Sequence, residues 1–257
     1  MKILIYGLNY APEVVGIAKY TTELSEWLSK RDNMITVISS VPYYPHWNVK
    51  KNRYQRYSYE NLKIYKCPIW VPLRLNGIKR ILHLLSFSLT SFPILLRQVI
   101  LKPDVIMVIA PSILCTPSVI ILKRLVHPKT KIWLHIQDFE IDAAFNLNLL
   151  KGQIIRSLSE KIEQIIYTNF DQISTISNSM IKKLLMKGIE EKKIFYLPNW
   201  YQKVKDINLK KISKNQYLRD LNIPLDSKII LYSGSINEKQ GIETLVEVFK
   251  YLDNISN

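Results

Sequence analysis

The amino-acid sequence predicts an α/β protein built around a doubly wound parallel sheet. Short, uninterrupted apolar runs rich in Ile and Val alternate with helical stretches along nearly the whole chain. Such runs are typical of strands that are buried on both faces, as in parallel sheets. The resulting βαβα order implies right-handed crossovers between neighbouring strands. A strand, a glycine-containing loop and a helix also follow one another twice, near residues 2–31 and near residues 228–252.

Seven apolar runs are expected to form the strands of the first sheet. They are Ile3–Tyr6, Ile35–Ser39, Leu62–Cys67, Val105–Ala110, Lys131–Ile136, Gln172–Ile176 and Ile194–Leu197. Two of the helical stretches between them carry an apolar stripe of the kind that faces a core. The stripes are Ile17, Tyr20, Leu24, Trp27 and Leu28 in the first helix, and Ile155, Leu158, Ile162, Ile165 and Ile166 in a later one.

The two strand–loop–helix openings predict two α/β domains that face one cleft. The first run, Lys2–Gly7, leads to a loop with Gly16, and the second run, Lys228–Ser233, leads to a loop with Gly234. Such a unit can place backbone N–H groups and a helix N-terminus against a phosphate. We expect a first domain at residues 1–200, a linker at 201–226, and the first strand and helix of a second, truncated domain at 227–257.

The charge balance of the chain is strongly basic. Lys and Arg number 36 against 21 Asp and Glu, a net charge of +15, which attracts nucleic acid, anionic lipid or phosphorylated substrates. A solvated basic surface is the alternative reading. The chain has no recognition helix, zinc pattern or RNP-like motif, so nucleic acid is not an expected partner. Cys67 and Cys115 lie in apolar surroundings without metal-ligand spacing and, with no secretion signal, indicate a cytoplasmic protein.

One apolar stretch raises the question of a membrane. Ile81–Leu96 contains no charged residue, is flanked by Lys79, Arg80 and Arg97, and includes a proline. It is shorter than the roughly 20 apolar residues that span a bilayer. We expect a helix that either is buried in the protein or lies on a membrane surface, where its basic flanks would meet anionic lipid.

Several familiar motifs are absent. The sequence has no G-x-G-x-x-G, no Walker A lysine motif and no G-x-S-x-G, so dinucleotide binding, P-loop hydrolysis and acyl hydrolysis are not predicted. Gly16, just before the first helix, is either a turn glycine or a point where the backbone approaches a ligand closely.

Polar and aromatic side chains gather near two expected strand ends, where open parallel sheets bind ligands. His135 and Asp138 belong to the segment HIQDFEID, although His135 could equally be a hydrogen-bonded core residue. If this segment continued as a strand, Asp138, Glu140 and Asp142 would share a face that could hold Mg²⁺ or Mn²⁺ as an alternative. A cluster of Tyr43, Tyr44, His46 and Trp47 follows the second strand and would stack on sugar rings or pack in the core.

Six segments, taken in order, resemble a known enzyme family. They are NYAPEVVGIAKYTTELSEWL, PYYP, WLHIQDFEIDAAF at Trp133–Phe145, ISTIS at Ile173–Ser177, LPNW at Leu197–Trp200, and YSGSINEKQGIETL at Tyr232–Leu245. Together they are similar to glycosyltransferase family 4, a retaining family of GT-B fold, and most of all to the colanic-acid-type exopolysaccharide glycosyltransferases. The resemblance runs from Met1 to about Val248.

This resemblance implies a first domain that binds the acceptor and a second that binds a nucleotide-sugar donor. The expected reaction moves a sugar to a glycan or polyprenyl-linked acceptor for cell-surface polysaccharide, without a metal or other cofactor. The expected location is cytoplasmic, at the inner face of the plasma membrane, whose anionic lipids suit the basic charge of the chain.

The resemblance also implies roles for particular residues. Gly16, Gly234 and Lys239 would bind the donor diphosphate, although Ser235 follows Gly234 where the family often has Arg. Asp138 is the expected catalytic residue, which would stabilise an oxocarbenium-like transition state, and His135 is the second choice. The expected acceptor-binding residues are Tyr43, Tyr44 and Trp47.

The expected second domain is incomplete in this chain, and this bears on activity. One strand and one helix cannot bury their own apolar faces. We therefore expect no measurable sugar transfer by these 257 residues alone. The alternative function is a non-catalytic acceptor- or membrane-binding module, or an inactive remnant, that needs a separate donor domain.

Overall fold

The computed structural model describes most of the chain. The described residues are 1–14, 16–74, 76–110, 113–146, 150–201, 214–227, 229–234, 236 and 241–255. The chain divides into two compact units, Met1–Trp200 and Tyr201–Asn257, and each is described by itself.

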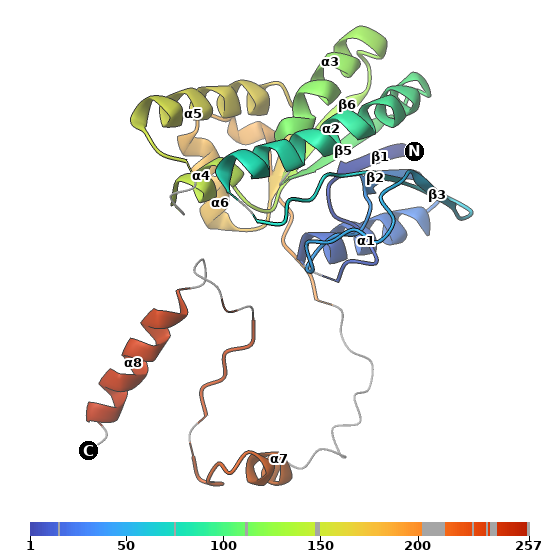
Figure 1. Cartoon of the computed structure of the whole chain (residues 1–257). Coiled ribbons are helices and arrows are strands. Elements are labelled where there is room, and N and C mark those ends of the chain that lie inside the picture. The colour runs from blue at the N-terminus through green and yellow to red at the C-terminus, as the bar shows by residue number, and fades with distance from the viewer. Residues whose placement is uncertain are drawn as a thin grey trace. The chain divides into compact units, whose positions relative to one another are not determined.

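The first unit contains an eight-stranded sheet (Figure 1). Its strands are β1 (Lys2–Gly7), β2 (Met34–Ser40), β3 (Gln55–Ser58), β4 (Leu62–Cys67), β5 (Val105–Ala110), β6 (Lys131–Ile136), β7 (Gln172–Thr175) and β8 (Ile194–Tyr196). The spatial order is β3-β4-β2-β1-β5-β6-β7-β8, and every neighbouring pair is parallel except β3–β4. The doubly wound parallel sheet predicted from the apolar runs is therefore confirmed, and each of the seven runs forms a strand.

The eighth strand, β3, has no counterpart in the sequence prediction. Its residues QRYS form no apolar run, and three of the four are exposed. It pairs antiparallel with β4 at the edge of the sheet. An edge strand needs neither a buried face nor β-branched residues on both sides, so the alternation that reveals the other strands is missing here.

Helices cover both faces of the sheet (Figure 1). They are α1 (Gly16–Ser29), α2 (Gly77–Ile100), α3 (Thr116–Val126), α4 (Glu140–Asn146), α5 (Gln153–Thr168) and α6 (Asn178–Met186), with short 3₁₀ turns η1 (Ile113–Cys115) and η2 (Glu191–Lys193). The larger core lies between the sheet and the side of α2, α3, α5 and α6. The smaller core lies on the opposite face, where Ile17, Leu24 and Leu28 of α1 pack over β1, β2 and β5.

The apolar stripes predicted for two helices are only partly buried. On α1, Trp27 is exposed, and the Arg31 guanidinium lies 3.6 Å from the centre of its ring. On α5, the predicted stripe is wrong as a core face, because Ile155, Leu158, Ile162 and Ile165 are all exposed. Of the predicted stripe only Ile166 is buried, and the other buried residues of this helix are Glu163 and Tyr167.

Helix α2, which includes the apolar stretch Ile81–Leu96, has one buried face and one exposed face. It is 24 residues long, starts at the N-cap Asn76 and, by length and composition alone, could cross a membrane. One face is nevertheless buried in the large core through residues such as Leu84, Phe87 and Leu95. The other face leaves Ile81, Leu85, Leu89 and Phe92 exposed. One face of α2 is therefore buried in the protein, as the first alternative expects, and the other face is exposed, as the membrane-surface alternative requires.

The second unit contains two helices in its described part, α7 (Lys214–Asp220) and α8 (Ile242–Ile255). The helix predicted after Gly241 is thus present. The strand predicted at 228–233 is not formed at residues 229–233, which have no regular structure. A strand requires a neighbour to pair its N–H and C=O groups, and none of the described residues supplies one.

Candidate functional site

The strand order places a topological switch point at the carboxyl ends of β1 and β5. The chain moves outward from β1 through β2 and β4 and then returns to β5 on the other side of β1. Loops that leave β1 and β5 therefore diverge to opposite sides, and ligands of open α/β sheets bind at this switch point. The loops after β1, β2 and β6 carry most of the sequence-predicted site residues of the first unit.

Gly16 is the first residue of α1, next to the carboxyl end of β1. A Cβ added at this glycine would meet no atom within 4 Å, so packing inside the protein does not require a glycine here. The N-terminal backbone of α1 carries N–H groups without helical partners and the positive end of the helix dipole. The open space above Gly16 therefore suits a close-lying anion, which agrees with the second of the two readings.

Glu13, which the sequence analysis did not single out, joins the loops after β1 and β2. Its side chain is only 6% exposed. Oε1 accepts hydrogen bonds from the backbone N–H groups of Tyr43 and Tyr44, at 2.9 and 3.0 Å, and Oε2 accepts one from the Asn9 amide at 2.8 Å. Below the same loop, the buried Lys66 ammonium donates to the carbonyl of Ala11 at 2.8 Å. These bonds fix the shape of both loops at the switch point.

The predicted acceptor residues form one aromatic cluster with a histidine from α2. The rings of Tyr43 and Trp47 meet edge to face with centroids 5.5 Å apart, and those of Tyr44 and Trp47 are 6.2 Å apart. The His83 ring lies 4.9 Å from the Tyr43 ring, and its Nδ1–H donates a hydrogen bond to the Trp70 carbonyl. Tyr43 is buried and Tyr44 is exposed, so only part of the cluster presents an aromatic face to a ligand.

Asp138 and Glu140 lie after β6, at the same edge. Asp138 is partly buried in the loop, and Glu140 begins α4. One Glu140 oxygen accepts the Ile113 N–H at 3.1 Å, and the other lies 3.8 Å from the Arg80 guanidinium. Burial raises the pKa of Glu140, and the Ile113 N–H and Arg80 oppose this only in part. The Glu140 carboxyl group is therefore held close to Ile113, after β5, and to α2.

The three alternating carboxylates do not share a strand face. Strand β6 ends at Ile136, and both Glu140 and Asp142 belong to α4. Asp142 instead pairs with Lys183 at 2.6 Å and with Lys187 at 3.4 Å. Within the part of the chain that the structure describes, no group of three or more His, Cys, Asp or Glu residues could hold a metal ion. The proposed Mg²⁺ or Mn²⁺ arrangement is therefore wrong in its geometry.

His135 lies inside β6 rather than at its exposed end. Its side chain is 4% exposed, and Nδ1 lies 2.8 Å from the Ser174 hydroxyl, which also accepts the Trp133 indole N–H. Burial lowers the pKa of His135 to about 4, which the Ser174 contact only partly offsets. The imidazole is therefore neutral at physiological pH. A catalytic role for His135 stays a prediction, and this environment favours the core alternative.

The buried histidine makes the fold sensitive to mild acid. The unfolded chain takes up a proton at His135 near pH 6.5, whereas the folded chain does so only near pH 4. Stability from this group is thus complete above pH 6.5 and is lost as the pH falls towards 4, by up to about 3 kcal/mol. We expect the free energy of unfolding, measured in urea, to fall between pH 7 and pH 5 by roughly 2 kcal/mol more in the wild type than in His135→Asn. Parallel pH profiles for the two proteins would contradict a neutral, buried imidazole.

The expected donor residues of the second unit can be followed only in part. Gly234 is described, and a Cβ there would approach the Tyr232 hydroxyl to 2.8 Å, so this glycine allows a close contact. Lys239 lies outside the described residues. The structure therefore brings together Gly16, Tyr43, Tyr44, Trp47 and Asp138 at one edge of the first unit, while the roles of Gly234 and Lys239 stay predictions.

Comparison with known proteins places this geometry in context. No protein-family model matches the chain. Over 259 aligned residues, the chain is 40% identical to WcaI of Escherichia coli strain K12, a protein named provisionally as a colanic acid biosynthesis glycosyl transferase. The alignment covers 96% of this chain and 62% of the relative, so the chain spans less than two thirds of that protein.

Solved structures agree with this relationship at the level of fold. A sucrose-phosphate synthase from Thermosynechococcus elongatus matches with a TM-score of 0.60 and 14% identity, over 96% of this chain and 59% of the other. The catalytic domain of starch synthase IV from Arabidopsis thaliana matches with a TM-score of 0.53 and 11% identity, over 77% and 51%. The chain is thus similar in sequence to a glycosyl transferase and similar in fold to GT-B glycosyltransferases. Its first unit has the Rossmann-like sheet of the GT-B fold, as the sequence resemblance implied.

Three polar residues of this GT-B edge were missed by the sequence reasoning. Glu13 and Arg80 carry no motif by themselves, and His83 lies within an otherwise apolar helix. A usable signal existed for Glu13, because it is the one carboxylate in the loop between the first strand and its helix. No local signal marks Arg80, since its partner Glu140 lies sixty residues further along the chain.

Proposed function

We propose that the protein is the acceptor-binding part of a retaining glycosyltransferase that builds cell-surface polysaccharide. A sugar would pass from a nucleotide-sugar donor to a glycan or polyprenyl-linked acceptor at the cytoplasmic face of the plasma membrane. The observation that carries this proposal is the 40% identity to the E. coli glycosyl transferase along 96% of the chain. Three features at the carboxyl edge of the sheet support it: the open N-terminus of α1, the Asp138 carboxylate and the exposed Tyr44 ring.

The donor diphosphate would lie against the N-terminus of α1. Gly16 leaves that helix end open, and unpaired backbone N–H groups there stabilise negative charge without a metal ion. The starch synthase of similar fold was solved with ADP and acarbose bound, a nucleoside diphosphate together with an oligosaccharide. We therefore propose a nucleotide-sugar donor and no metal cofactor.

Bond cleavage between the sugar and the diphosphate would develop positive charge at the anomeric carbon. The Asp138 carboxylate, in the loop after β6, is the side chain that we assign to stabilise this charge or to hold the sugar hydroxyls. Glu140 is less suited to an ionic role, because its burial raises its pKa. Tyr44, the exposed member of the aromatic cluster, offers a face on which a sugar ring can stack.

A lipid-linked acceptor is supported by an apolar cavity beside this edge. The cavity has a volume of about 380 Å³ and lies between α2, α4 and α5, with Arg80 and Glu140 among its lining residues. Its apolar walls include Ile81 and Ile162, which belong to the exposed faces of α2 and α5. A polyprenyl chain would find here an apolar surface next to the candidate site. The basic flanks of α2 would meet anionic lipid head groups.

The non-catalytic alternative keeps one supporting observation. The described residues of the second unit contain two helices and no strand. A module that binds acceptor or membrane, and that needs a separate donor domain for transfer, agrees with this composition. The two functions differ in turnover and not in acceptor binding.

The distinguishing experiment measures transfer of radiolabelled sugar from nucleotide sugars to polyprenyl-linked acceptors extracted from bacterial membranes. The purified chain is assayed alone and with a separately expressed donor domain of the E. coli relative. Label in the lipid extract in either assay supports the enzyme. Binding to acceptor-loaded vesicles without label in both assays supports the module. Neither binding nor transfer would sink both proposals.

Gly16→Ala separates the fold from ligand binding in the same assay. Since a Cβ at this position meets nothing, we expect the melting temperature to stay unchanged or to rise slightly, as alanine favours a helix. We expect transfer to fall at least roughly tenfold, because a methyl group would stand between the helix end and the diphosphate. Unchanged transfer by the stable variant would remove the α1 N-terminus from the donor site.

A further inference from the structure

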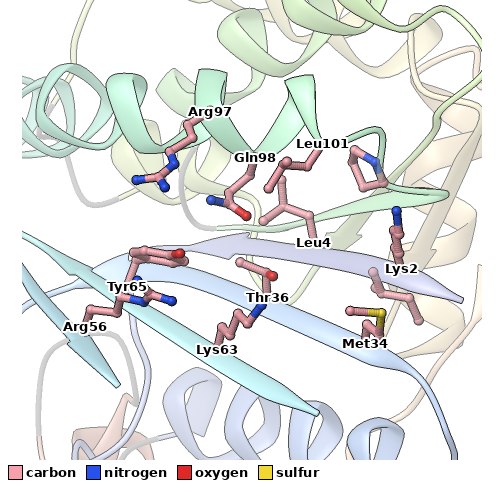
Figure 2. A pocket seen from close by; sticks show the side chains of 12 residues that line it. Lys2, Leu4, Met34, Thr36, Arg56, Lys63, Tyr65, Arg97, Gln98 and Leu101 are labelled. Carbon is pink, nitrogen blue, oxygen red and sulfur yellow. The ribbon is translucent and has the colours of Figure 1, made fainter. Parts of the chain in front are cut away.

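A second cavity lies at the opposite end of the sheet from the candidate site. It has a volume of about 320 Å³ and lies between the C-terminal part of α2 and the first halves of β1, β2 and β4 (Figure 2). The strand register explains which side chains meet there. Leu4 pairs with Thr36, and Thr36 pairs with Lys63, so these three side chains form one row on the face covered by α2.

Four cationic side chains line this cavity: Lys2, Arg56, Lys63 and Arg97. The lining contains no carboxylate. Among the ion pairs between described residues, none involves any of these four side chains. The Asp104 carboxylate is already bound to the backbone N–H of Lys2 at 2.7 Å. The cavity is therefore a concentrated positive field whose charges have not been neutralised within the described chain.

A neutral amide from α2 also lines the cavity. Gln98 is 7% exposed, and its side chain is among the lining residues. Figure 2 shows the Gln98 amide reaching from α2 towards the sheet, above the side chains of Thr36 and Tyr65. An amide N–H group in this position can donate hydrogen bonds to an occupant of the cavity. An occupant that accepts hydrogen bonds and carries negative charge would suit both the amide and the four cations.

We propose that this cavity is a binding site for a phosphate-bearing anion. The Arg56 and Arg97 guanidinium groups would bind phosphate oxygens in the bidentate geometry that arginine favours, and Lys63 would add a point charge from the sheet. Gln98 and Thr36 would donate hydrogen bonds to the remaining oxygens. At about 320 Å³, the cavity is at the small end of ligand pockets and fits a phosphorylated head group rather than a whole nucleotide sugar.

Two sources of this chemistry are a soluble phosphate ester and the head group of an anionic phospholipid. The rim of the cavity favours neither, because it combines exposed apolar residues, Met34 and Leu101, with open access to water. The proposal does not depend on sugar transfer, since the cavity lies far along the strands from the candidate site and shares none of its residues.

The test titrates glycerol 3-phosphate into the full chain and follows binding by calorimetry. The pocket variant is Lys63→Gln with Arg97→Gln, and the charge-matched control is Lys30→Gln with Lys129→Gln, two exposed lysines without ion pairs among the described residues. We expect saturable one-to-one binding that weakens at least tenfold in the pocket variant and stays unchanged in the control. The absence of saturable binding, or equal weakening in both variants, would overturn the proposal.

A second variant separates loss of binding from loss of folding. Gln98→Leu removes the amide and retains the apolar packing of the side chain, so we expect full thermal stability with at least fivefold weaker binding of glycerol 3-phosphate. Tight binding by this stable variant would count against the site.

Sedimentation with vesicles distinguishes the two sources. If the pocket variant loses at least fivefold more binding to phosphatidylglycerol vesicles than the lysine control does, and neither binds phosphatidylcholine, the ligand is a lipid head group. If both variants bind these vesicles equally while only the pocket variant loses glycerol 3-phosphate, the ligand is a soluble phosphate ester.

Discussion

Lys187→Met is expected to destabilise the first unit by about 3–5 kcal/mol, because it leaves a buried carboxylate without its counter-charge. Glu163 is only 1% exposed and forms an ion pair with the Lys187 ammonium. The Tyr167 hydroxyl donates to the same carboxylate at 2.7 Å, and Asp142 lies 3.4 Å from Lys187. Burial alone would lower the pKa of Lys187, but Glu163 and Asp142 outweigh it and raise this pKa. The ammonium is therefore charged and joins α4, α5 and α6.

Urea unfolding at pH 7 measures this loss of stability, and two further variants serve as controls. Lys183 also binds Asp142, at 2.6 Å, but its side chain is 42% exposed, so Lys183→Met should cost no more than about 1 kcal/mol. The double variant Lys187→Met with Glu163→Gln removes the unpaired charge and should recover much of the loss. Equal losses for the two single lysine variants would show that burial of Glu163 does not set the cost.

Glu13→Ala is expected to destabilise the chain by about 3 kcal/mol and to free both loops of the candidate site. The substitution leaves the backbone N–H groups of Tyr43 and Tyr44 without their acceptor, and each buried orphan costs about 1–3 kcal/mol. Asn9 loses its partner on the loop after β1 as well. Because the aromatic cluster depends on these bonds, we also expect at least a roughly hundredfold loss of transfer in any assay in which the wild type is active.

Hydrogen exchange at the two tyrosine amides reports this change directly. We expect exchange at Tyr43 and Tyr44 to accelerate strongly in Glu13→Ala and to a lesser degree in Glu13→Gln, whose amide oxygen can still accept one of the bonds. Glu26→Ala is the control, because Glu26 is exposed on α1 and its loss should change the free energy of unfolding by less than about 0.5 kcal/mol. Protection that survives in Glu13→Ala would show that the loops are held by other contacts.

Most of the sheet follows from local sequence, for a physical reason that particular strands illustrate. Strands β4, β5 and β6 have the bounds that their apolar runs predicted. Strand β5 shows the reason most clearly, because a strand buried on both faces is apolar along its whole length. Strand β3 escaped prediction because its edge position imposes no such pattern. The apolar stripe of α5 was placed on the wrong side, since amphipathicity alone does not reveal which face meets the core and which remains exposed.

The sequence by itself determined the fold class, the strands of the main sheet, and the family resemblance that the relatives confirm. It also placed Gly16, Tyr44 and Asp138 at the ends of strands, since the carboxyl ends of parallel strands meet at one edge. Only the tertiary structure decided that Glu13 joins two loops, that His135 is buried and neutral, and that Lys63 and Arg97 share a cavity. These three features depend on contacts between residues that are far apart in the chain. Local sequence patterns do not show which distant side chains come into contact.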